Sequence, residues 1–283
     1  MSTEDALLHR FAREAMSTTF EIVVRGAEKE YARQAARAAF QELDRIEKEL
    51  SRFISYSDVA QINRLRAGES VRAGIATLEC LRLAQQVHDE TGGAFDVTYL
   101  WRAARSHPSL ATGPSPLSIN EPDHSVGVMA DGVIVDLGAI GKGYAVDQIT
   151  ALLRDWSIEE ALVHSGESSA FALGSWSVAI RDPERQEEIL GRVQLRDRSL
   201  SGSGLLLHGA HIIDPRTGRP AEGKRGTWAL APSAAASDAL STAFMVMSPS
   251  EVEEYCRQHT DISGMIVTGN PGGYELLRFG NWE

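Results

Sequence analysis

Stretches of helical and of strand periodicity alternate irregularly along this chain, and this mixture restricts its fold more than any other feature. From Met16 to Arg25, apolar and polar residues alternate with the period of two that is typical of a strand. From Glu28 to Leu50, apolar residues recur at helical spacing with charges between them. No regular βαβ repeat is present. The pattern therefore predicts an α+β fold, in a layered α/β/α arrangement built on a largely antiparallel sheet.

The same periodicities predict the remaining elements. Helices are expected at 57–63, 75–90, 144–156, 238–247 and 251–259, and strands at 161–164, 176–181, 190–195, 205–207, 211–213, 227–230, 265–268 and 274–278. Asp131-Gly132 in the middle of 126–137 is a strong signal for a β-hairpin. Residues 102–124 are rich in Pro and Ser and lack periodicity, so we expect a long loop there, a candidate lid or binding loop.

Composition excludes several classes of protein. The 28 Lys and Arg residues against 39 Asp and Glu give a net charge of −11, which disfavours a nucleic-acid-binding surface but not local phosphate binding. No apolar run approaches the roughly 20 residues of a transmembrane helix. Two cysteines exclude a disulfide scaffold and a cysteine-rich zinc site. The N-terminus lacks an apolar signal core, so we expect a cytoplasmic protein, or an exported or periplasmic one whose signal peptide has been removed.

A glycine-rich segment, DLGAIGKGYAVD from Asp136 to Asp147, lies between a predicted strand and a predicted helix. Its glycines let backbone N–H groups approach a phosphate, and a helix N-terminus favours negative charge. The spacing matches neither a P-loop nor the GxGxxG fingerprint. The segment is a candidate phosphate site, or a tight strand-to-helix turn without a ligand.

Two further segments carry candidate chemistry. Asp238 and Thr242 are four residues apart, so a helix places both oxygens on one face, as a hard cation such as Mg²⁺ or Ca²⁺ requires. The alternative is an acid at a helix N-terminus and a threonine bonded back to its own helix. His211 ends a strand-like run and can act as a general base. Asp214 and Arg216 after it either contribute to the site or form an ion-paired turn.

Six segments in this order resemble the ApbE family, the FAD:protein FMN transferases. The resemblance rests on MSTTFEI (16–22), SRFISYSDVAQIN (51–63), GGAFDVT (92–98), DLGAIGKGYAVD (136–147), HIIDPRTG (211–218) and ASDALSTA (236–243). They are similar to the family's MGT-type strand, S-x-Y…S-E-L-S-x-L-N, G-G-x-F-D-P-T, D-L-G-G-I-G-K-G-Y-x-x-D, H-I-I-D-P-R-T-G and A-x-A-D-A-L-S-T-A patterns. The match spans nearly the whole chain, so we expect residues 1–283 to form a single domain.

The resemblance implies a T-fold-like architecture and a transferase. Such an enzyme binds FAD with a divalent metal, usually Mg²⁺, and moves FMN to a Ser or Thr of an acceptor flavoprotein with AMP as the leaving group. The family's metal ligands fall on Asp238, Thr242 and a backbone carbonyl at Ala139, and its catalytic residues fall on His211 and Asp238. The implied contacts to FAD are Met16, Phe53, Asp96, Ala139, Lys142, Asp147, Ser165, Gly166, Glu167 and His211. Asp96 and Asp147 can alternatively brace loops.

This sequence departs from the family patterns on the flavin side. Ser17 replaces the glycine of MGT, Phe53 replaces a tyrosine and Val97 replaces a proline. Glu167 replaces a glycine of the turn after the central strand, and Leu200 replaces the threonine of a T-S-G segment. Two alternatives to the transferase therefore remain open: a metal-dependent FAD hydrolase that forms FMN and AMP, and an FAD-binding protein that has lost transfer activity.

Overall fold

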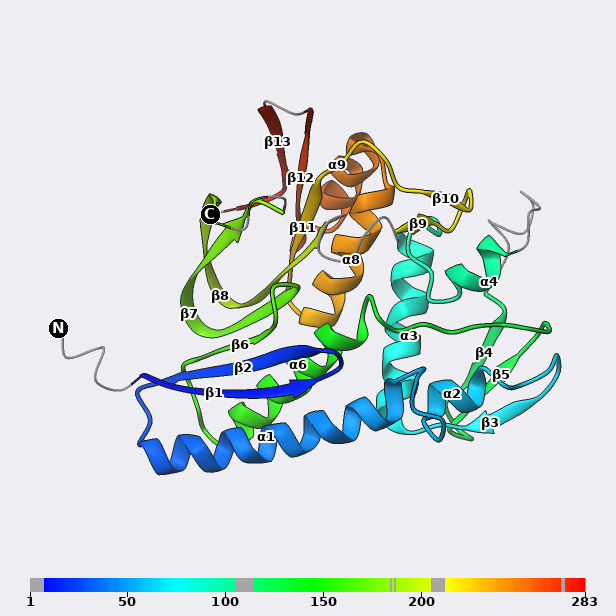
Figure 1. Cartoon of the computed structure of the whole chain (residues 1–283), viewed down its shortest axis with the longest axis horizontal. Coiled ribbons are helices and arrows are strands. Elements are labelled where there is room, and N and C mark those ends of the chain that lie inside the picture. The colour runs from blue at the N-terminus through cyan, green and yellow to red at the C-terminus, as the bar shows by residue number, and fades with distance from the viewer. Residues whose placement is uncertain are drawn as a thin grey trace.

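An eight-stranded sheet runs through the molecule (Figure 1). The computed structural model describes residues 8–104, 115–183, 185, 187–204, 212–270 and 273–282. The strands follow the order β1 (Leu8–Ala15), β2 (Thr18–Arg25), β6 (Ala161–Ser165), β7 (Ser169–Arg181), β8 (Ile189–Gly204), β11 (Gly226–Ala231), β12 (Ser263–Asn270) and β13 (Gly273–Phe279). Every neighbouring pair is antiparallel. The predicted α+β class with a largely antiparallel sheet is confirmed.

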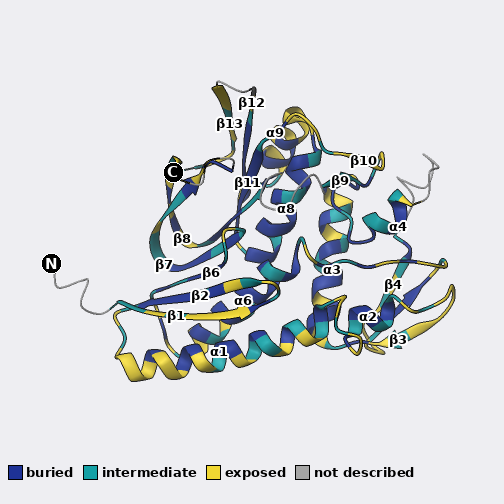
Figure 2. Cartoon of the chain, viewed as in Figure 1, coloured by how far each residue is buried: buried dark blue, intermediate teal, exposed yellow. Residues whose placement is uncertain are grey.

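The longer helices enclose the main apolar core together with one face of this sheet. They are α1 (Lys29–Leu50), α3 (Ile75–Glu90), α6 (Gly141–Asp155), α8 (Ala234–Val246) and α9 (Pro249–Gln258), and the short α2 (Asp58–Ile62) and α4 (Tyr99–Ala103) complete the set described. Side chains from different elements meet in this core, among them Phe20 on β2, Leu43 on α1 and Phe244 on α8, all fully buried. α1 is amphipathic and leaves its outer face exposed, whereas α8 is buried almost along its whole length (Figure 2).

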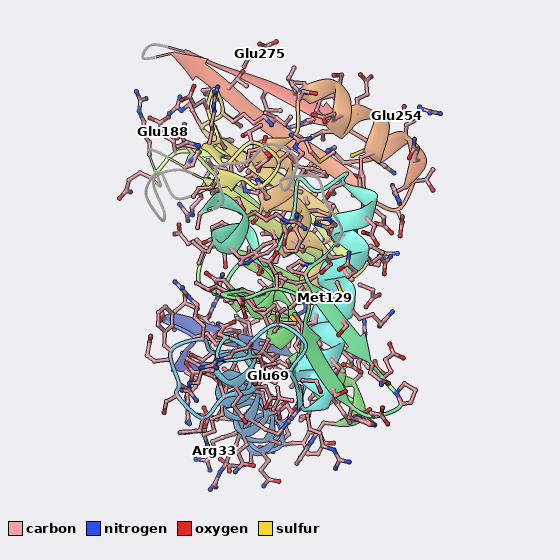
Figure 3. The ribbon with its side chains drawn as sticks, turned by 90° about the vertical axis from the view of Figure 1, so that its right-hand side faces the viewer. Arg33, Glu69, Met129, Glu188, Glu254 and Glu275 are labelled. Carbon is pink, nitrogen blue, oxygen red and sulfur yellow. The ribbon has the colours of Figure 1, made fainter. Side chains whose placement is uncertain are left out.

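The other face of the sheet carries a second, smaller apolar cluster. Strands β7, β8, β11 and β12 supply its buried members, which include Leu195, Trp228 and Met265. β7, β11 and β12 also send alternate residues to the main core, as Ala229 and Ile266 do. This division follows from the period-2 geometry of a strand. In a view turned by 90°, α1 lies at one end of the molecule and β12 and β13 at the other, and the labelled Arg33 and Glu275 point outward there (Figure 3).

The structure corrects two predictions in the middle of the chain. Residues 126–137 do not form a hairpin, because β5 (Ser125–Val128) pairs with β4 (Leu117–Asn120) and β3 (Ser70–Arg72) in a separate three-stranded sheet. Residues 133–137 instead run as irregular chain, fastened by two hydrogen bonds between Val135 and Asn63. The loop predicted at 102–124 contains β4 and the end of α4, and its residues 105–114 lie outside the described residues.

The other helices and strands agree with their sequence patterns, apart from their limits. β1, β3 and α4 have no counterpart in the sequence prediction, and β7 and β8 are longer than predicted. The strand predicted at 205–207 lies outside the described residues, and of the strand predicted at 211–213 only the end is described, where β9 (Ile213–Asp214) pairs with β10 (Arg219–Pro220). No helix in the described part of the chain is long and apolar enough to span a membrane.

Candidate functional site

A cavity of about 500 Å³ opens where the segments with sequence motifs meet. Its wall comes from the β1–β2 turn, the C-terminal end of α1, the glycine-rich segment, the end of β8 and one side of α8. Of the predicted site residues, the wall contains Met16, Phe53, Asp96, Ala139, Lys142, Asp238 and Thr242. The structure thus brings together residues that are more than 200 positions apart in the sequence.

Polar groups within the glycine-rich segment hold its shape. Oδ1 of Asp136 accepts a hydrogen bond from the N–H of Gly138 at 2.9 Å, and the Lys142 ammonium donates to the Gly138 carbonyl at 2.7 Å. α6 begins immediately afterwards at Gly141, so the N-terminus of a 15-residue helix lies at the cavity wall. The positive end of a helix dipole and its backbone N–H groups favour an anion, and this wall therefore suits a phosphate.

The last glycine of this segment lies where α6 and α8 touch. A Cβ atom on Gly143 would stand 2.2 Å from the carbonyl oxygen of Ala234, so a larger residue has no room. The N–H of Gly143 donates a hydrogen bond to Oδ2 of Asp238 at 3.0 Å. Gly143 therefore serves the packing of the two helices, and its amide orients the carboxylate predicted as a metal ligand.

The predicted metal ligands form an oxygen-rich corner of the cavity. Asp238 and Thr242 lie one turn apart on α8, and Asp238 is only 3 % exposed. The Thr242 hydroxyl lies 3.2 Å from the hydroxyl of Ser203 and 3.3 Å from the Asp238 carbonyl oxygen. Ala139 also lines the cavity, so the three predicted ligands comprise a carboxylate, a hydroxyl and a backbone carbonyl. These are the hard oxygen donors that Mg²⁺ prefers, so the donor set fits a divalent cation.

The protein supplies few metal-coordinating groups in this corner. Among the described residues, no group of three or more His, Cys, Asp or Glu side chains is arranged to hold a metal ion. An ion bound here would need water or ligand phosphate oxygens for the rest of its coordination shell. Mg²⁺ commonly binds in this way, through one or two carboxylates together with substrate phosphates.

A ladder of buried hydroxyls joins α8 to β8 behind these ligands. Oγ of Ser237 lies 2.8 Å from Oγ of Ser199 and 2.6 Å from that of Ser201, and Oγ of Ser241 lies 2.9 Å from Oγ of Ser203. Sequence reasoning missed this contact. The sequence signal for this contact is a serine at every second position of β8 together with two serines one turn apart on α8. The small side chains let α8 lie close against the sheet.

The β1–β2 turn forms one edge of the cavity. Met16 and Ser17 both have left-handed backbone conformations, with φ of 50° and 61°. Two-residue hairpin turns of this type favour Gly and Asn, which explains why a glycine suits the position of Ser17. The N–H of Met16 donates to Oε1 of Glu47 at 2.6 Å, and this bond fixes the turn to α1.

An aromatic and charged cluster forms another part of the cavity wall. Phe53 is 80 % exposed, and the Arg52 guanidinium lies 4.6 Å from the centre of its ring. Nε of Arg52 lies 3.4 Å from Oδ2 of Asp136, and the Tyr99 hydroxyl donates to the same oxygen at 3.5 Å. Burial, assisted by the nearby charge of Asp136, raises the pKa of Tyr99, so its hydroxyl remains a donor at neutral pH.

Asp96 and Asp147 brace the structure. Asp96 lines the cavity, but its carboxylate pairs with the buried Arg102 and accepts the N–H of Thr98 at 2.6 Å. Asp147 is not on the cavity wall. Its two oxygens accept the first two amides of α8 at 2.6 and 2.8 Å, and burial raises the pKa of Asp147 to about 6.

The turn between β6 and β7 contributes less to the wall than expected. Ser165, Gly166 and Glu167 do not line the cavity, whereas the next residue, Ser168, does. Gly166 has a φ of 55°, and a Cβ there would lie 2.4 Å from the hydroxyl of Thr18. This glycine therefore serves the packing of the turn against β2.

His211 lies outside the described residues, but the segment that follows it borders the cavity through Ile212, Ile213 and Pro215. Arg216 anchors this segment. Its guanidinium donates to Asp214 at 3.1 Å and to Glu251 on α9 at 2.8 Å. Asp214 and Arg216 therefore form the ion-paired turn that the sequence left as one alternative.

A buried lysine adds a second anchor. The Lys224 ammonium donates to the carbonyls of Phe244 and Met247 at the C-terminal end of α8. Burial lowers the pKa of Lys224 to about 8. A cation in this position satisfies terminal carbonyls of the helix and complements its dipole.

Comparisons with known proteins show which proteins this chain is similar to in sequence and in structure. The model of the ApbE family matches residues 16–266. The chain is 28 % identical over 267 residues to an FAD:protein FMN transferase of Klebsiella pneumoniae, covering 83 % of this chain and 82 % of that protein. It is 26 % identical over 293 residues to one of Salmonella typhimurium, with 91 % and 83 % covered. The crystal structure of the ApbE protein from Thermotoga maritima superposes with a TM-score of 0.81 at 25 % identity, over 96 % of this chain and 97 % of that one.

Proposed function

The chain belongs to the ApbE family and is a flavin transferase; we propose that it moves FMN from FAD to a Ser or Thr hydroxyl of an acceptor flavoprotein, with Mg²⁺ as the metal and AMP as the leaving group. One observation supports this proposal above the others. A single cavity combines a helix N-terminus suited to phosphate with an oxygen-donor corner suited to a divalent cation. A pyrophosphate needs both.

The proposed reaction is a phosphoryl transfer. The acceptor hydroxyl oxygen attacks the FMN-side phosphorus of FAD, a new P–O bond forms there, and the pyrophosphate bond to AMP breaks. The hydroxyl proton passes to a base, and AMP leaves with the bridging oxygen. Because such a reaction depends on positioning and on charge stabilisation, the chain's task is to hold the pyrophosphate in line with the acceptor.

Two groups of residues divide this task, one for the phosphates and one for the metal. The backbone around Gly138 and Gly141, together with Lys142, would donate to the phosphates. Asp238, Thr242 and the carbonyl of Ala139 would hold Mg²⁺, which when bound neutralises charge on the pyrophosphate and on the departing AMP. Met16 and Phe53, which both line the cavity, would contact FAD beyond its pyrophosphate. The exposed ring of Phe53 offers a face for stacking but no hydroxyl.

His211 is the proposed general base. A serine or threonine hydroxyl is a weak nucleophile, and a neutral imidazole within hydrogen-bond reach activates it. The segment after His211 borders the cavity and is anchored by Arg216 and Lys224 at the end of α8. The position of these following residues at the cavity supports the assignment of His211.

A single assay separates transfer from its two alternatives. The purified protein is incubated with FAD, Mg²⁺ and an acceptor protein; protein-bound flavin is read by in-gel fluorescence, and AMP is quantified by chromatography. We expect AMP and bound flavin in equal amounts, and neither when Mg²⁺ is chelated. AMP without bound flavin would identify a hydrolase. FAD binding without either product would identify a binding protein.

A further inference from the structure

α6 and α8 cap each other at their N-termini. Asp147, on the second turn of α6, accepts hydrogen bonds from Ala234 at 2.6 Å and Ala235 at 2.8 Å, the first two residues of α8. In return, Asp238 on the second turn of α8 accepts a hydrogen bond from Gly143, the third residue of α6, at 3.0 Å. We call these contacts the reciprocal cap.

The reciprocal cap leaves no room for the helices to slide. The site where a Cβ of Gly143 would stand is only 2.2 Å from the carbonyl oxygen of Ala234, so the two backbones are in contact. The first turn of α8 has one more cap, because Oγ of Ser233 accepts the N–H of Ala236 at 3.1 Å. Ser233 caps its own helix, whereas Asp147 ties the same turn to another helix.

We propose that Asp147 is a positioning residue, which places the Asp238 carboxylate in the cavity by holding the start of α8 against α6. Asp147 does not line the cavity, so its effect reaches the site through α8. Asp238 follows Ala234 by one helical turn, and a helix transmits such a position rigidly over that distance. This inference rests on the proposed function in one respect: it takes Asp238 to be a metal ligand.

A direct role of Asp147 toward a ligand is disfavoured by the same contacts. Both of its carboxylate oxygens already accept a backbone amide. These two amides are among the donors that a helix leaves unsatisfied at its N-terminus. Removing the carboxylate would release them and loosen the first turn of α8, while the hydroxyl ladder would still hold the middle of α8 to β8.

The test compares Asp147→Ala and Asp147→Asn with Ser233→Ala. The serine variant is the matched control, since it removes a cap from the same helical turn without touching α6. Two readouts avoid catalysis: hydrogen exchange of the amides at the start of α6, which include Gly143, and binding of Mn²⁺ in the presence of FAD, followed by electron paramagnetic resonance. Thermal unfolding establishes that each variant is folded. The asparagine variant keeps one hydrogen-bond acceptor and the shape of the aspartate side chain. If the alanine variant does not fold, the same two readouts are taken on the asparagine variant.

We expect Asp147→Ala to speed exchange at the start of α6 and to weaken Mn²⁺ binding about 10- to 100-fold, the range typical of residues that support a metal ligand. Asp147→Asn should fall between it and the wild type, and Ser233→Ala should change neither readout more than about threefold. Equal effects of the alanine variants at both residues would overturn the proposal, because the role would then be helix stability alone. Faster exchange at α6 with no bound Mn²⁺ even in the wild-type protein would instead overturn the metal site of the proposed function.

Discussion

The two side-chain oxygens proposed to hold the metal differ in charge. Asp238 is the only anionic group of the set, and Thr242 contributes a neutral hydroxyl. We expect Asp238→Asn, which keeps the shape and an acceptor for the Gly143 amide, to lower the transfer rate by about 100-fold or more at any Mg²⁺ concentration. Thr242→Ala should raise the Mg²⁺ concentration needed for half-maximal rate by roughly tenfold. Both are measured by AMP release during Mg²⁺ titration.

The control for this pair is the melting temperature, which should stay close to that of the wild-type protein for Asp238→Asn. Wild-type turnover of that variant at limiting Mg²⁺ would place the metal elsewhere in the molecule.

His211 should affect the rate and its pH dependence rather than ligand binding. General base catalysis typically contributes about 10²–10⁴-fold, so His211→Asn should slow transfer by that range while FAD affinity changes little. The wild-type rate should rise with pH through a limb at about 6 to 7 as the imidazole loses its proton, and the variant should lack that limb. Rate–pH profiles with an FAD titration on each protein measure both effects. A variant that keeps the limb, or whose loss of rate follows unfolding, would remove His211 from the catalytic residues.

At the level of helices, the crossing of α6 and α8 is the least tolerant contact. An alanine at Gly143 would place its Cβ 2.2 Å from a backbone oxygen of α8, so the helices would have to separate. Gly141, two residues earlier in α6, would meet only ordinary contacts, the nearest 3.6 Å away. We expect Gly143→Ala to lower the free energy of unfolding by about 1–3 kcal/mol or more, and Gly141→Ala to leave it unchanged or raise it by up to ~1 kcal/mol.

Urea unfolding of both glycine variants measures this difference. Similar stability of the two would mean that the helices can separate at little cost.

The C-terminal end of α8 should make stability depend on alkaline pH. Burial lowers the pKa of Lys224 to about 8, whereas an unfolded chain leaves a lysine near its ordinary value. Between these values the unfolded state binds more protons than the native state, so this group makes the free energy of unfolding rise with pH. Methionine does not titrate, so the Lys224→Met variant serves as the reference. Between pH 8 and 10.5, the unfolding free energy of the wild type should rise relative to that of the variant by up to about 3 kcal/mol.

Urea unfolding of these two proteins at several pH values in that interval tests the sign. A difference that is flat, or that falls as pH rises, would show that the Lys224 ammonium is not destabilised by burial in the native state.

The whole molecule should unfold as one unit, in agreement with the single domain proposed for 1–283. Strands β7, β11 and β12 place alternate residues in both apolar clusters, so neither cluster can be lost while the other keeps its strands. We expect coincident thermal transitions by far-ultraviolet circular dichroism and by tryptophan fluorescence, which reports on Trp156 near the main core and Trp228 in the second cluster. The calorimetric and van't Hoff enthalpies should also agree. Two separate transitions would divide the chain into domains.

The local sequence pattern predicted most of the helices and strands, because the spacing of apolar residues along a short segment distinguishes a helix from a strand. It failed where a distant partner decides the outcome. Asp131-Gly132 does form a turn, but the chain after it is fastened to Asn63 instead of folding back on β5. β1 carries charges along an exposed edge and shows no clear alternation, and its pairing with β2 alone makes it a strand.

The sequence by itself determined the chemistry available to this protein: a glycine-rich segment before a helix, a carboxylate and a hydroxyl one turn apart, and the family to which these motifs belong. Only the tertiary structure decided which groups serve a ligand and which serve the fold. Asp147 and Asp238 are both acidic residues within motifs, yet one caps a neighbouring helix outside the cavity and the other lines the cavity wall. The reason is physical. Residue type sets what a side chain can bind. Its actual partners come together only when the chain packs, as the hydrogen bond between Gly143 and Asp238, 95 positions apart, illustrates.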